Sequence, residues 1–418
     1  MSQKHKILIF SLGYYPKHIG GAEVAIKEIT DRLDPEQYEF HLIANRYDST
    51  LPKVEQINHV TVHRIGFTRH EPSIAELRTL PLHLNKVWYQ WQAFRIAKRL
   101  HKQEGFAAIW AMMAHATGVP AALFKRRFPE VRYLLTLQEG DPPPLIEKKM
   151  RWFGRWFDRA FTTADQVQVI SSFLSRWAKQ KGFAREPILI PNAVTTEHFS
   201  RPIDTATRQR WREGWGVGAE ATLLVTTSRL VHKNAVDDVI RALPLLPNKV
   251  QFIVYGTGPE EAMLKALATE LGVARRVHFA GFIEHAKMPP ALKACDIFIR
   301  PSRSEGMGNS FIEAMAAELP VIATQEGGIA DFLFDATRNP AQPATGWAVD
   351  ANAPAQIAAA VQHIRDHPKA VAETVARAKA MAEAEYDWDL IATRMHEEIF
   401  QPLLADVDQV APQRQQHQ

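Results

Sequence analysis

Two glutamates close together carry the strongest chemical signal in this sequence. Glu305 follows an apolar run that ends at Ile299, and Glu313 lies eight positions later in a segment of helical pattern. Glycines beside Glu305 let the backbone approach a ligand, and the free amides at a helix start suit a phosphate. Two carboxylates flanking such a phosphate can accept hydrogen bonds from a sugar and a ribose. The simpler alternative is that both glutamates are solvated, but the apolar neighbours of Glu313 predict that its carboxylate needs a partner.

A pair of cations forms the second candidate site. Arg229 and Lys233 follow another apolar run, which ends near Thr226. Fixed cations can clamp a diphosphate and stabilise the negative charge that grows on the terminal phosphate of a departing nucleotide. Two solvated loop residues would give the same pattern, so the acidic pair in the same half of the chain is what favours a binding site.

The first half of the chain holds weaker candidates. Gly20 and Gly21 follow the first apolar run and open a helical segment, which is typical of a phosphate-facing loop, although a tight turn would look the same. Histidine and glutamine side chains follow two later strands and should reach the ligand-binding edge of the sheet. A lone histidine in an apolar context is more often structural, and glutamine donates hydrogen bonds but is no general base. The candidates on the acceptor side are His115, Gln138, Glu139 and Asp141.

Short apolar runs that alternate with helical segments must position these residues. The expected strands lie at 6–11, 38–44, 60–65, 107–112, 132–137, 167–170 and 188–190, and then at 222–226, 251–255, 277–279, 297–299 and 321–323. This alternation predicts an α/β fold with parallel sheets covered on both faces. Because the pattern restarts and the chain is long, it predicts two Rossmann-like doubly wound domains that face a cleft.

The same pattern predicts where the domains begin and end. We expect a first domain at 1–195, completed by a C-terminal helix at about 386–405, and a second domain at 196–385. The polar stretch 199–220, irregular at its start, is expected to join the halves. The polar tail 406–418 is expected to fray.

The spacing Glu305-x7-Glu313, followed by AMAAELPVIAT and a glycine pair, resembles the acidic motif of the retaining glycosyltransferases of family 4, which have the GT-B architecture. The resemblance covers nearly the whole chain, including the SRL…K motif at Arg229 and Lys233 and a GGAE loop at Gly20. It implies transfer of a sugar from a UDP- or GDP-sugar to a glycan, lipid-linked or small-molecule acceptor. A bound cofactor or metal is not expected, and the leaving phosphate helps to deprotonate the acceptor.

The resemblance also implies roles for single residues. Glu305 would contact the donor sugar, Glu313 the ribose hydroxyls, and Arg229 with Lys233 the pyrophosphate. The sugar-phosphate site would be lined by the amides of Gly306, Met307, Gly308 and Asn309, with Gly20 and Gly21 facing it. The chain departs from the family where many relatives carry a histidine in place of Gln138 and a glycine in place of Asn234. Acceptor recognition is expected in the loops around 46–53 and 67–84, which show no readable pattern.

Composition narrows the class of protein. The chain of 418 residues is 46% hydrophobic and 23% charged, as in globular proteins, and its single cysteine, Cys295, favours an intracellular, cytoplasmic location. The net charge of +4 is spread along the chain, so nucleic-acid binding is not expected. The uncharged stretch 106–124 is long enough to suggest a membrane span, but Gly118 and Pro120 favour a buried strand followed by a buried helix.

The segment 147–161 leaves two alternatives open. If the segment is one helix, Trp152 and Trp156 are four positions apart on it, and so are Phe153 and Phe157. A basic row of Arg151, Arg155 and Arg159 runs beside them. A core-facing amphipathic helix is the favoured alternative. Peripheral contact with an anionic membrane, at the inner membrane face, is the other.

Two other patterns resemble cofactor sites without completing them. Asp387-Trp388-Asp389 has a D-x-D form used by metal-dependent glycosyltransferases of another fold, but Asp387 is placed as the N-cap of a helix. The run Gly256-Thr257-Gly258 is a partial dinucleotide fingerprint that lacks the last glycine. We therefore expect neither a metal nor NAD.

Other functions compete with the leading one. An epimerase or phosphorylase of the same architecture, or a sugar-nucleotide or polysaccharide-binding protein that has lost activity, would share most of the pattern. The set of Arg229, Lys233, Glu305 and Glu313 argues against the first, and Gln138 keeps the second open.

Overall fold

The computed structural model describes residues 4–17, 19–73 and 76–405. The chain divides into two compact units, which are described separately here. The first unit runs to Asn192 and resumes at Trp388, and the second spans Ala193–Asp387. The predicted polar tail at 406–418 lies outside the described residues.

The first unit is built on an eight-stranded sheet with the strand order β3-β4-β2-β1-β5-β6-β7-β8. Its neighbouring strands are parallel except for β3 and β4. All five residues of β5 are buried, so helices must cover both faces of the sheet. The strands are β1 His5–Phe10, β2 Tyr38–Asn45, β3 Val54–Ile57, β4 Val60–Ile65, β5 Ala108–Met112, β6 Arg132–Leu137, β7 Gln166–Val169 and β8 Ile188–Leu189.

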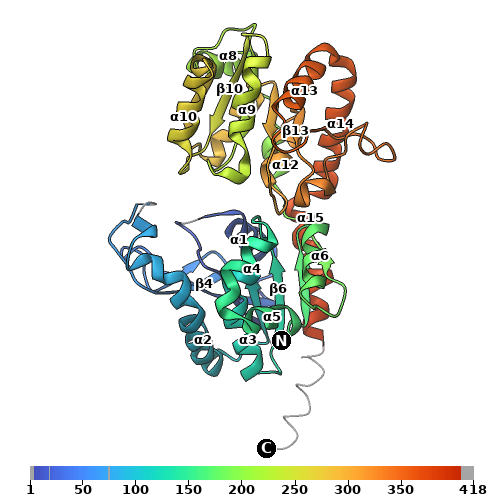
Figure 1. The fold of residues 1–418 in the computed structure, drawn as a ribbon. Coiled ribbons are helices and arrows are strands. Elements are labelled where there is room, and N and C mark those ends of the chain that lie inside the picture. Colours follow the sequence, from blue (N-terminus) through green and yellow to red (C-terminus); the bar gives the residue numbers. More distant parts are fainter. Residues whose placement is uncertain (1–3, 18, 74–75, 406–418) are drawn as a thin grey trace, which may run out of the picture. The chain divides into compact units, whose positions relative to one another are not determined.

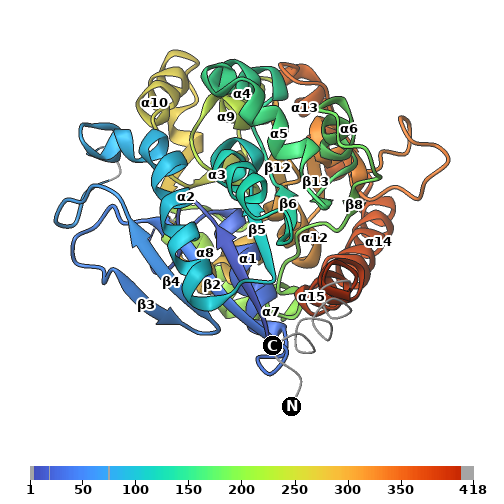
Figure 2. The same ribbon diagram turned by 90° about the horizontal axis from the view of Figure 1, so that it is seen from below.

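The helices of this unit follow the strands in the predicted alternation. They are α1 Gly21–Arg32, α2 Asn85–Glu104, α3 Ala114–Arg127, α4 Pro143–Met150, α5 Arg155–Thr162 and α6 Ser172–Gln180. Helix α3 packs against α2 and α5 (Figures 1 and 2). The uncharged stretch 106–124 forms β5 and most of the buried helix α3, as predicted. Within the described residues, no helix is long and apolar enough to cross a membrane.

The C-terminal segment belongs to the first unit. Helix α15, Trp388–Arg394, packs against α1, and Arg32 forms an ion pair of 2.6 Å with Asp389. Arg394 Nη2 donates to the carbonyl of Leu189 at 2.9 Å. A π-helical turn at Met395–Phe400 follows α15. The last described segment therefore adds a packed layer to a sheet whose strands lie some two hundred or more positions earlier in the chain.

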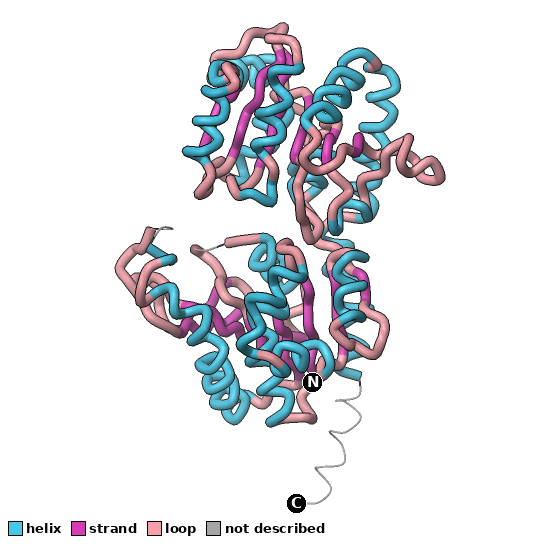
Figure 3. The backbone as a smooth tube through the Cα atoms, in the orientation of Figure 1, coloured by secondary structure: helices cyan, strands magenta, loops and turns pink. Residues whose placement is uncertain are grey.

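The second unit is built on a six-stranded parallel sheet with the order β11-β10-β9-β12-β13-β14. Figure 3 shows the strands in magenta with helices in cyan around them. The strands are β9 Thr222–Thr227, β10 Val250–Tyr255, β11 Val277–Gly281, β12 Ile297–Arg300, β13 Val321–Ala323 and β14 Trp347–Ala348. The helices are α7 Thr196–Ser200, α8 Thr205–Gly214, α9 Val236–Ala242, α10 Glu261–Glu270, α11 Met288–Lys293, α12 Asn309–Ala316, α13 Pro354–Asp366 and α14 Pro368–Glu385. One apolar core joins residues of β9 and β10 to α9, α10 and α13.

Some elements differ from the sequence-based expectations. Strand β3 was not predicted, because its residues are alternately exposed and half-buried at a sheet edge and form no apolar run. Part of the stretch 199–220 is the helix α8, capped by Asp204, whose carboxylate accepts from the amide of Thr207 at 2.6 Å. Arg212 of this helix is buried and donates to the carbonyl of Ala294 at 3.1 Å. The stretch is therefore part of the second unit as well as a connection to it.

The segment 147–161 is not one helix. Helix α4 ends at Met150, a short 3-10 turn covers Arg151–Phe153, and α5 begins after Gly154. Gly154 has φ +45°, which breaks the helical path. The expected i, i+4 pairing of Trp152 with Trp156 was therefore wrong, since the two lie on different elements.

Candidate functional site

The loop between β12 and α12 holds Glu305 in place. The carboxylate of Glu305 accepts one hydrogen bond from Arg300 Nη2 at 2.7 Å and one from the amide of Gly306 at 3.2 Å. Gly308 precedes the helix with φ +91°, and a Cβ there would lie 2.7 Å from Arg300 Nη2 and 2.6 Å from the Phe311 ring. Only glycine fits at Gly308, so the turn into α12 is made without a side chain at this position.

Arg300, which pairs with Glu305, is a residue that the sequence analysis did not identify. It is the last residue of β12, and its guanidinium is buried, donates to Ser310 Oγ at 2.7 Å and lies 4.2 Å from the Phe311 ring centroid. Burial lowers the pKa of Arg300, while the negative charges of Glu305 and Glu313 act in the opposite direction. The signal that could have found it is a cation ending an apolar strand, because a buried cation needs a fixed carboxylate partner.

A glycine loop after β10 holds the loop that carries Arg229. Gly256 has φ +127°, and a Cβ there would lie 1.8 Å from the carbonyl oxygen of Ser228. The amide of Leu230 donates to the carbonyl of Thr257 at 3.1 Å. The Gly256-Thr257-Gly258 run therefore acts as a structural support for the neighbouring loop, and the side chain of Arg229 is exposed beside it.

The two second-unit loops that hold the predicted charges lie side by side. Strands β9 and β12 are paired in parallel, so both loops leave the same edge of the sheet. The amide of Arg303 donates to the carbonyl of Lys233 at 2.7 Å, and its guanidinium donates to the carbonyl of His232 and to Asp237. The cation loop and the acidic loop are thus fastened to each other through Arg303.

Strand β13 contributes a third loop to this edge. The amide of Gly328 donates to the carbonyl of Glu305 at 3.1 Å, and Thr324 Oγ1 donates to the carbonyl of Ser302 at 2.6 Å. The strands β10, β9, β12 and β13 are consecutive in the sheet, so their loops form one continuous surface. The structure brings together Arg229, Lys233, Glu305, Gly306, Met307, Gly308 and Asn309 on these neighbouring loops and the start of α12, where Gly306 and Met307 are buried.

Glu313 lies in the second turn of α12 and has the partner that its apolar neighbours predicted. Its carboxylate lies 3.5 Å from Nε2 of His285, an interaction that is ionic only when the imidazole is protonated. His285 belongs to a short turn after β11 and is mostly exposed. At the start of the same helix, Asn309 Nδ2 donates to the carbonyl of Ala193 at 3.3 Å. The Glu313 side chain is therefore largely buried, with 12% of its surface exposed, and its partner His285 is mostly exposed.

In the first unit, Gly20 and Gly21 lie exposed at the start of α1. The amide of Gly20 donates to Glu23 Oε2 at 2.8 Å, which closes the first turn. Burial raises the pKa of Glu23, and its hydrogen bonds from the backbone act in the opposite direction. This glycine pair follows β1 and so lies at the carboxyl edge of the first sheet.

Three of the four acceptor-side candidates also meet at that edge. Nδ1 of His115 lies 3.2 Å from Oε1 of the fully buried Glu139, whose Oε2 accepts from the amide of Gln138 at 3.0 Å. The side-chain amides of Gln138 and Asn192 exchange two hydrogen bonds of 3.0 and 3.1 Å. The His115 side chain is one-third exposed, so solvent reaches it, whereas the Glu139 side chain is fully buried.

Asp141 stands apart from that group. Its carboxylate forms an ion pair of 3.1 Å with Lys149 of α4, and both side chains are largely exposed. Asn192 is the partner that the sequence did not reveal, because it lies 54 positions from Gln138.

The described residues also contain a cluster with metal-ligand chemistry that the sequence analysis did not identify. It consists of Glu39 and His41, near the start of β2, and Glu104, the last residue of α2. The Lys6 ammonium lies 2.6 Å from Glu104 and 3.5 Å from Glu39, so it neutralises charge inside the cluster. His41 Nδ1 lies 3.1 Å from His63 Nε2.

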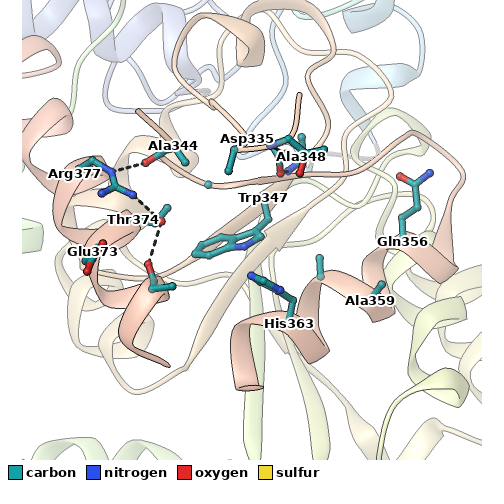
Figure 4. A pocket seen from close by; sticks show the side chains of 15 residues that line it. Asp335, Ala344, Trp347, Ala348, Gln356, Ala359, His363, Glu373, Thr374 and Arg377 are labelled. Carbon is teal, nitrogen blue, oxygen red and sulfur yellow. Dashed lines mark hydrogen bonds between the residues drawn. The ribbon is translucent and has the colours of Figure 1, made fainter. Parts of the chain in front are cut away.

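A separate cavity of about 640 Å³ lies on the second unit between α13, α14 and the edge strand β14. The indole of Trp347 lies at its centre, with His363 of α13 beside it and Arg377 of α14 bonded to Thr374 and Ala344 (Figure 4). None of the predicted site residues lines this cavity.

Two family models match the chain. The model of the glycosyl transferase 4-like domain matches residues 20–193, and the model of glycosyl transferases group 1 matches residues 207–381. Together they span most of both units.

Curated relatives match either a shorter part of the chain or a longer part at lower identity. A GDP-mannose-dependent alpha-(1-6)-phosphatidylinositol monomannoside mannosyltransferase of Mycobacterium tuberculosis is 32% identical over 243 residues, which are 55% of this chain and 60% of that relative. The chain thus spans less than two thirds of that relative's length. An uncharacterized glycosyltransferase of Methanocaldococcus jannaschii is 24% identical over 78% of this chain and 82% of its own.

Solved structures share the fold at low sequence identity. Sucrose-phosphate synthase from Thermosynechococcus elongatus superposes with a TM-score of 0.77 at 21% identity, covering 96% of this chain and all of that one. Anabaena HepE, solved in complex with UDP and glucose, gives a TM-score of 0.73 at 21% identity over 94% of this chain and 99% of its own. With two parallel α/β sheets, both family models and these likenesses, the chain belongs to the group 1, family 4-like glycosyltransferases of GT-B fold.

Proposed function

We propose that the protein is a retaining glycosyltransferase that moves a sugar from a UDP- or GDP-sugar to a glycan, lipid-linked or small-molecule acceptor. The observation that carries this proposal is the continuous loop surface of the second unit. There, Glu305 is fixed by the buried Arg300, and the loop of Arg229 and Lys233 is fastened to it through Arg303.

Each charge has a chemical task in the proposed reaction. Arg229 and Lys233 bind the pyrophosphate and stabilise the negative charge that develops as its bond to the sugar breaks. Glu305 accepts hydrogen bonds from the sugar, and Glu313 from the ribose. In this proposal the phosphate lies at the start of α12, at the positive end of the helix dipole.

The first unit supplies the acceptor side in this proposal. Gly20 and Gly21 face the donor phosphate, and Gln138 donates a hydrogen bond to an acceptor or donor hydroxyl. The phosphate oxygen that leaves the sugar takes the proton of the incoming hydroxyl on the same face, and the new bond forms at the carbon that the phosphate leaves. His115, whose Nδ1 lies 3.2 Å from Oε1 of Glu139, is a further candidate for contact with the acceptor in this proposal.

The test is donor turnover by the wild type and by the variants Glu305→Ala and Arg229→Ala. Each variant should lower turnover at least about a hundredfold, the usual effect of losing a preorganised charge contact. Lys249→Ala, which removes an exposed lysine at the opposite edge of the same sheet, is the matched control and should keep wild-type turnover. Full activity of Glu305→Ala or Arg229→Ala would show that the assigned role is wrong.

The donor base is part of the same test. A nucleotide that binds the folded state raises its melting temperature, so UDP and GDP can be compared directly. The Mycobacterium relative uses GDP-mannose, and HepE was solved with UDP, so both bases are candidates here. A shift with neither nucleotide would contradict the proposed donor class.

We also propose peripheral contact with an anionic membrane through the turn that bears Trp152. This indole is 87% exposed, and Arg151 lies next to it. Trp156 is covered by the guanidinium groups of Arg126 and Arg159, so it is not available for insertion. Flotation with anionic vesicles at low salt, lost at high salt and in Trp152→Ser, is the expected result; no flotation at low salt would remove this part of the proposal.

A further inference from the structure

A basic pocket of about 280 Å³ opens on the first unit where β2 and β4 end. Strand β2 ends at Asn45 and β4 at Ile65, and the residues that follow each strand line the pocket. The lining side chains that matter here are Arg46, Lys53, Arg64, Phe67, Trp88 and Gln92. In open α/β sheets, ligands bind beyond the carboxyl ends of the strands, and this pocket lies at that edge.

The pocket has more positive charge than its own carboxylates can neutralise. Arg64 is almost fully buried and pairs with Glu55 at 2.6 Å, so its charge is balanced. Within the part of the chain that the structure describes, the Arg46 guanidinium donates to the backbone carbonyls of Leu51 at 2.7 Å and Ser49 at 2.8 Å. Lys53 is exposed, and among the described residues neither it nor Arg46 has a carboxylate within ion-pair distance. Two cations are therefore left to face an anion.

One wall of the pocket is aromatic and held firmly. The rings of Phe67 and Trp88 lie 6.1 Å apart, and the two residues are 38% and 47% exposed. The buried Asn85 side chain accepts from the amide of Phe67 at 2.7 Å and donates to its carbonyl at 2.8 Å. The backbone of Phe67 is therefore fixed in this wall, and Gln92 also lines the pocket.

We infer that this pocket binds an anionic group, a phosphate or a carboxylate, carried by a saccharide acceptor. The inference deepens the proposed function, and the identification of the ligand as the acceptor rests on that function. The two cations would hold the anion, while the aromatic wall and the Gln92 amide would hold the apolar face and hydroxyls of the attached ring.

The position of the pocket also indicates how far the anionic group lies from the reacting hydroxyl of the acceptor. The strand order β4-β2-β1-β5 places β4 three strands from β5, which His115 follows. At about 4.8 Å per strand, the two positions are about 14 Å apart. The anionic group therefore lies on a part of the acceptor remote from the hydroxyl that reacts.

Calorimetric binding to the full chain at low salt tests the inference. The probes are mannose 6-phosphate and glucuronic acid, with mannose and inorganic phosphate as comparisons. The wild type should bind at least one of the two anionic sugars, and Arg46→Gln/Lys53→Gln should weaken that binding at least about tenfold, as expected for the loss of charge-assisted contacts. Arg99→Gln/Lys102→Gln, two cations at the other end of α2, is the charge-matched control and should bind as the wild type does.

The contrary outcomes are distinct. Binding of neither anionic sugar, or equal binding by wild type and the pocket variant, would overturn the inference. If inorganic phosphate or mannose binds as tightly as the anionic sugar, the inference that one pocket recognises both the anion and the attached sugar ring is wrong. The rise in melting temperature with UDP or GDP tests the donor site separately, so a protein with no donor response but a variant-sensitive pocket would refute the proposed function and leave the anion site standing.

Discussion

The two units place polar residues at the carboxyl edge of a parallel sheet in different ways. In the second unit the loops are fixed by backbone contacts, as where Gly256 lies against Ser228 and Gly328 donates to Glu305. In the first unit the candidates are fixed by side-chain pairs, such as Gln138 with Asn192. Glycine-packed loops tolerate almost no substitution, whereas a side-chain pair can be exchanged for another. The difference agrees with the proposal of a donor site in the second unit and an acceptor side in the first.

The largest expected effect comes from Gly256→Ala. The new Cβ would lie 1.8 Å from the carbonyl of Ser228, and the residue would keep φ +127°, so both overpacking and backbone strain oppose it. We expect a loss of about 3–5 kcal/mol in the free energy of unfolding, together with weaker nucleotide binding, because the loop of Arg229 must move. Urea unfolding and the nucleotide-induced rise in melting temperature measure the two effects.

Gly272→Ala is the control for backbone strain alone. Gly272 has φ +70° and no atom within 4 Å of a new Cβ. It should cost only about 1 kcal/mol and leave nucleotide binding unchanged. Equal effects of the two variants would mean that the contact with Ser228 does not hold the loop.

The glycines of the second unit were visible in the sequence, but their use was not. The run Gly256-Thr257-Gly258 resembled part of a dinucleotide fingerprint, because both patterns need a backbone without a Cβ. Only the pairing of β9 with β10 shows that the close neighbour is the Arg229 loop. The acidic motif was easier to interpret, since Glu305, Gly308 and Glu313 lie within one loop and one helix.

The next largest effect is expected at Arg300. Arg300→Met keeps the length of the side chain but leaves Glu305 without its cation, so turnover should fall about a hundredfold. The double variant Arg300→Met/Glu305→Ala should be no slower than Glu305→Ala alone, because the two residues act as one unit. Kinetics of the three variants measure this; strictly additive losses would show that Arg300 does not act through Glu305.

A smaller effect is expected for the amide pair of the first unit. Gln138→Ala removes both hydrogen bonds that the Asn192 side-chain amide makes with Gln138, and Asn192→Ala removes the same two bonds from Gln138. Each should lower transfer about tenfold, in keeping with about 1–2 kcal/mol for an unpaired amide, while nucleotide binding keeps its wild-type strength. Weakened nucleotide binding in these variants would place the pair at the donor site and would contradict the proposed separation of donor and acceptor sites between the two units.

The sequence was less informative about the first unit because its contacts are long-range. Asn192 could not be assigned to Gln138 from a separation of 54 positions, and nothing local distinguishes it from a surface amide. Gly154 breaks the segment that looked like one amphipathic helix, since periodicity cannot reveal a positive φ. Alternation of apolar runs, in contrast, predicted strands such as β1, β5 and β9 within one or two residues, because burial on both faces leaves a local signature.

The smallest expected effect concerns acid stability of the first unit. Burial, helped by the neighbouring His41, lowers the pKa of His63 to about 4. Between about pH 6.5 and 4 the unfolded chain binds a proton at this histidine that the folded chain does not, so stability should fall as the pH falls through that range. The size should be about 1 kcal/mol, below the full linkage value, because the imidazole is partly exposed. His63→Gln should flatten the decline of the urea midpoint between pH 6.5 and 4.5, whereas the exposed His83→Gln should not; an unchanged slope in His63→Gln would mean that the decline arises elsewhere.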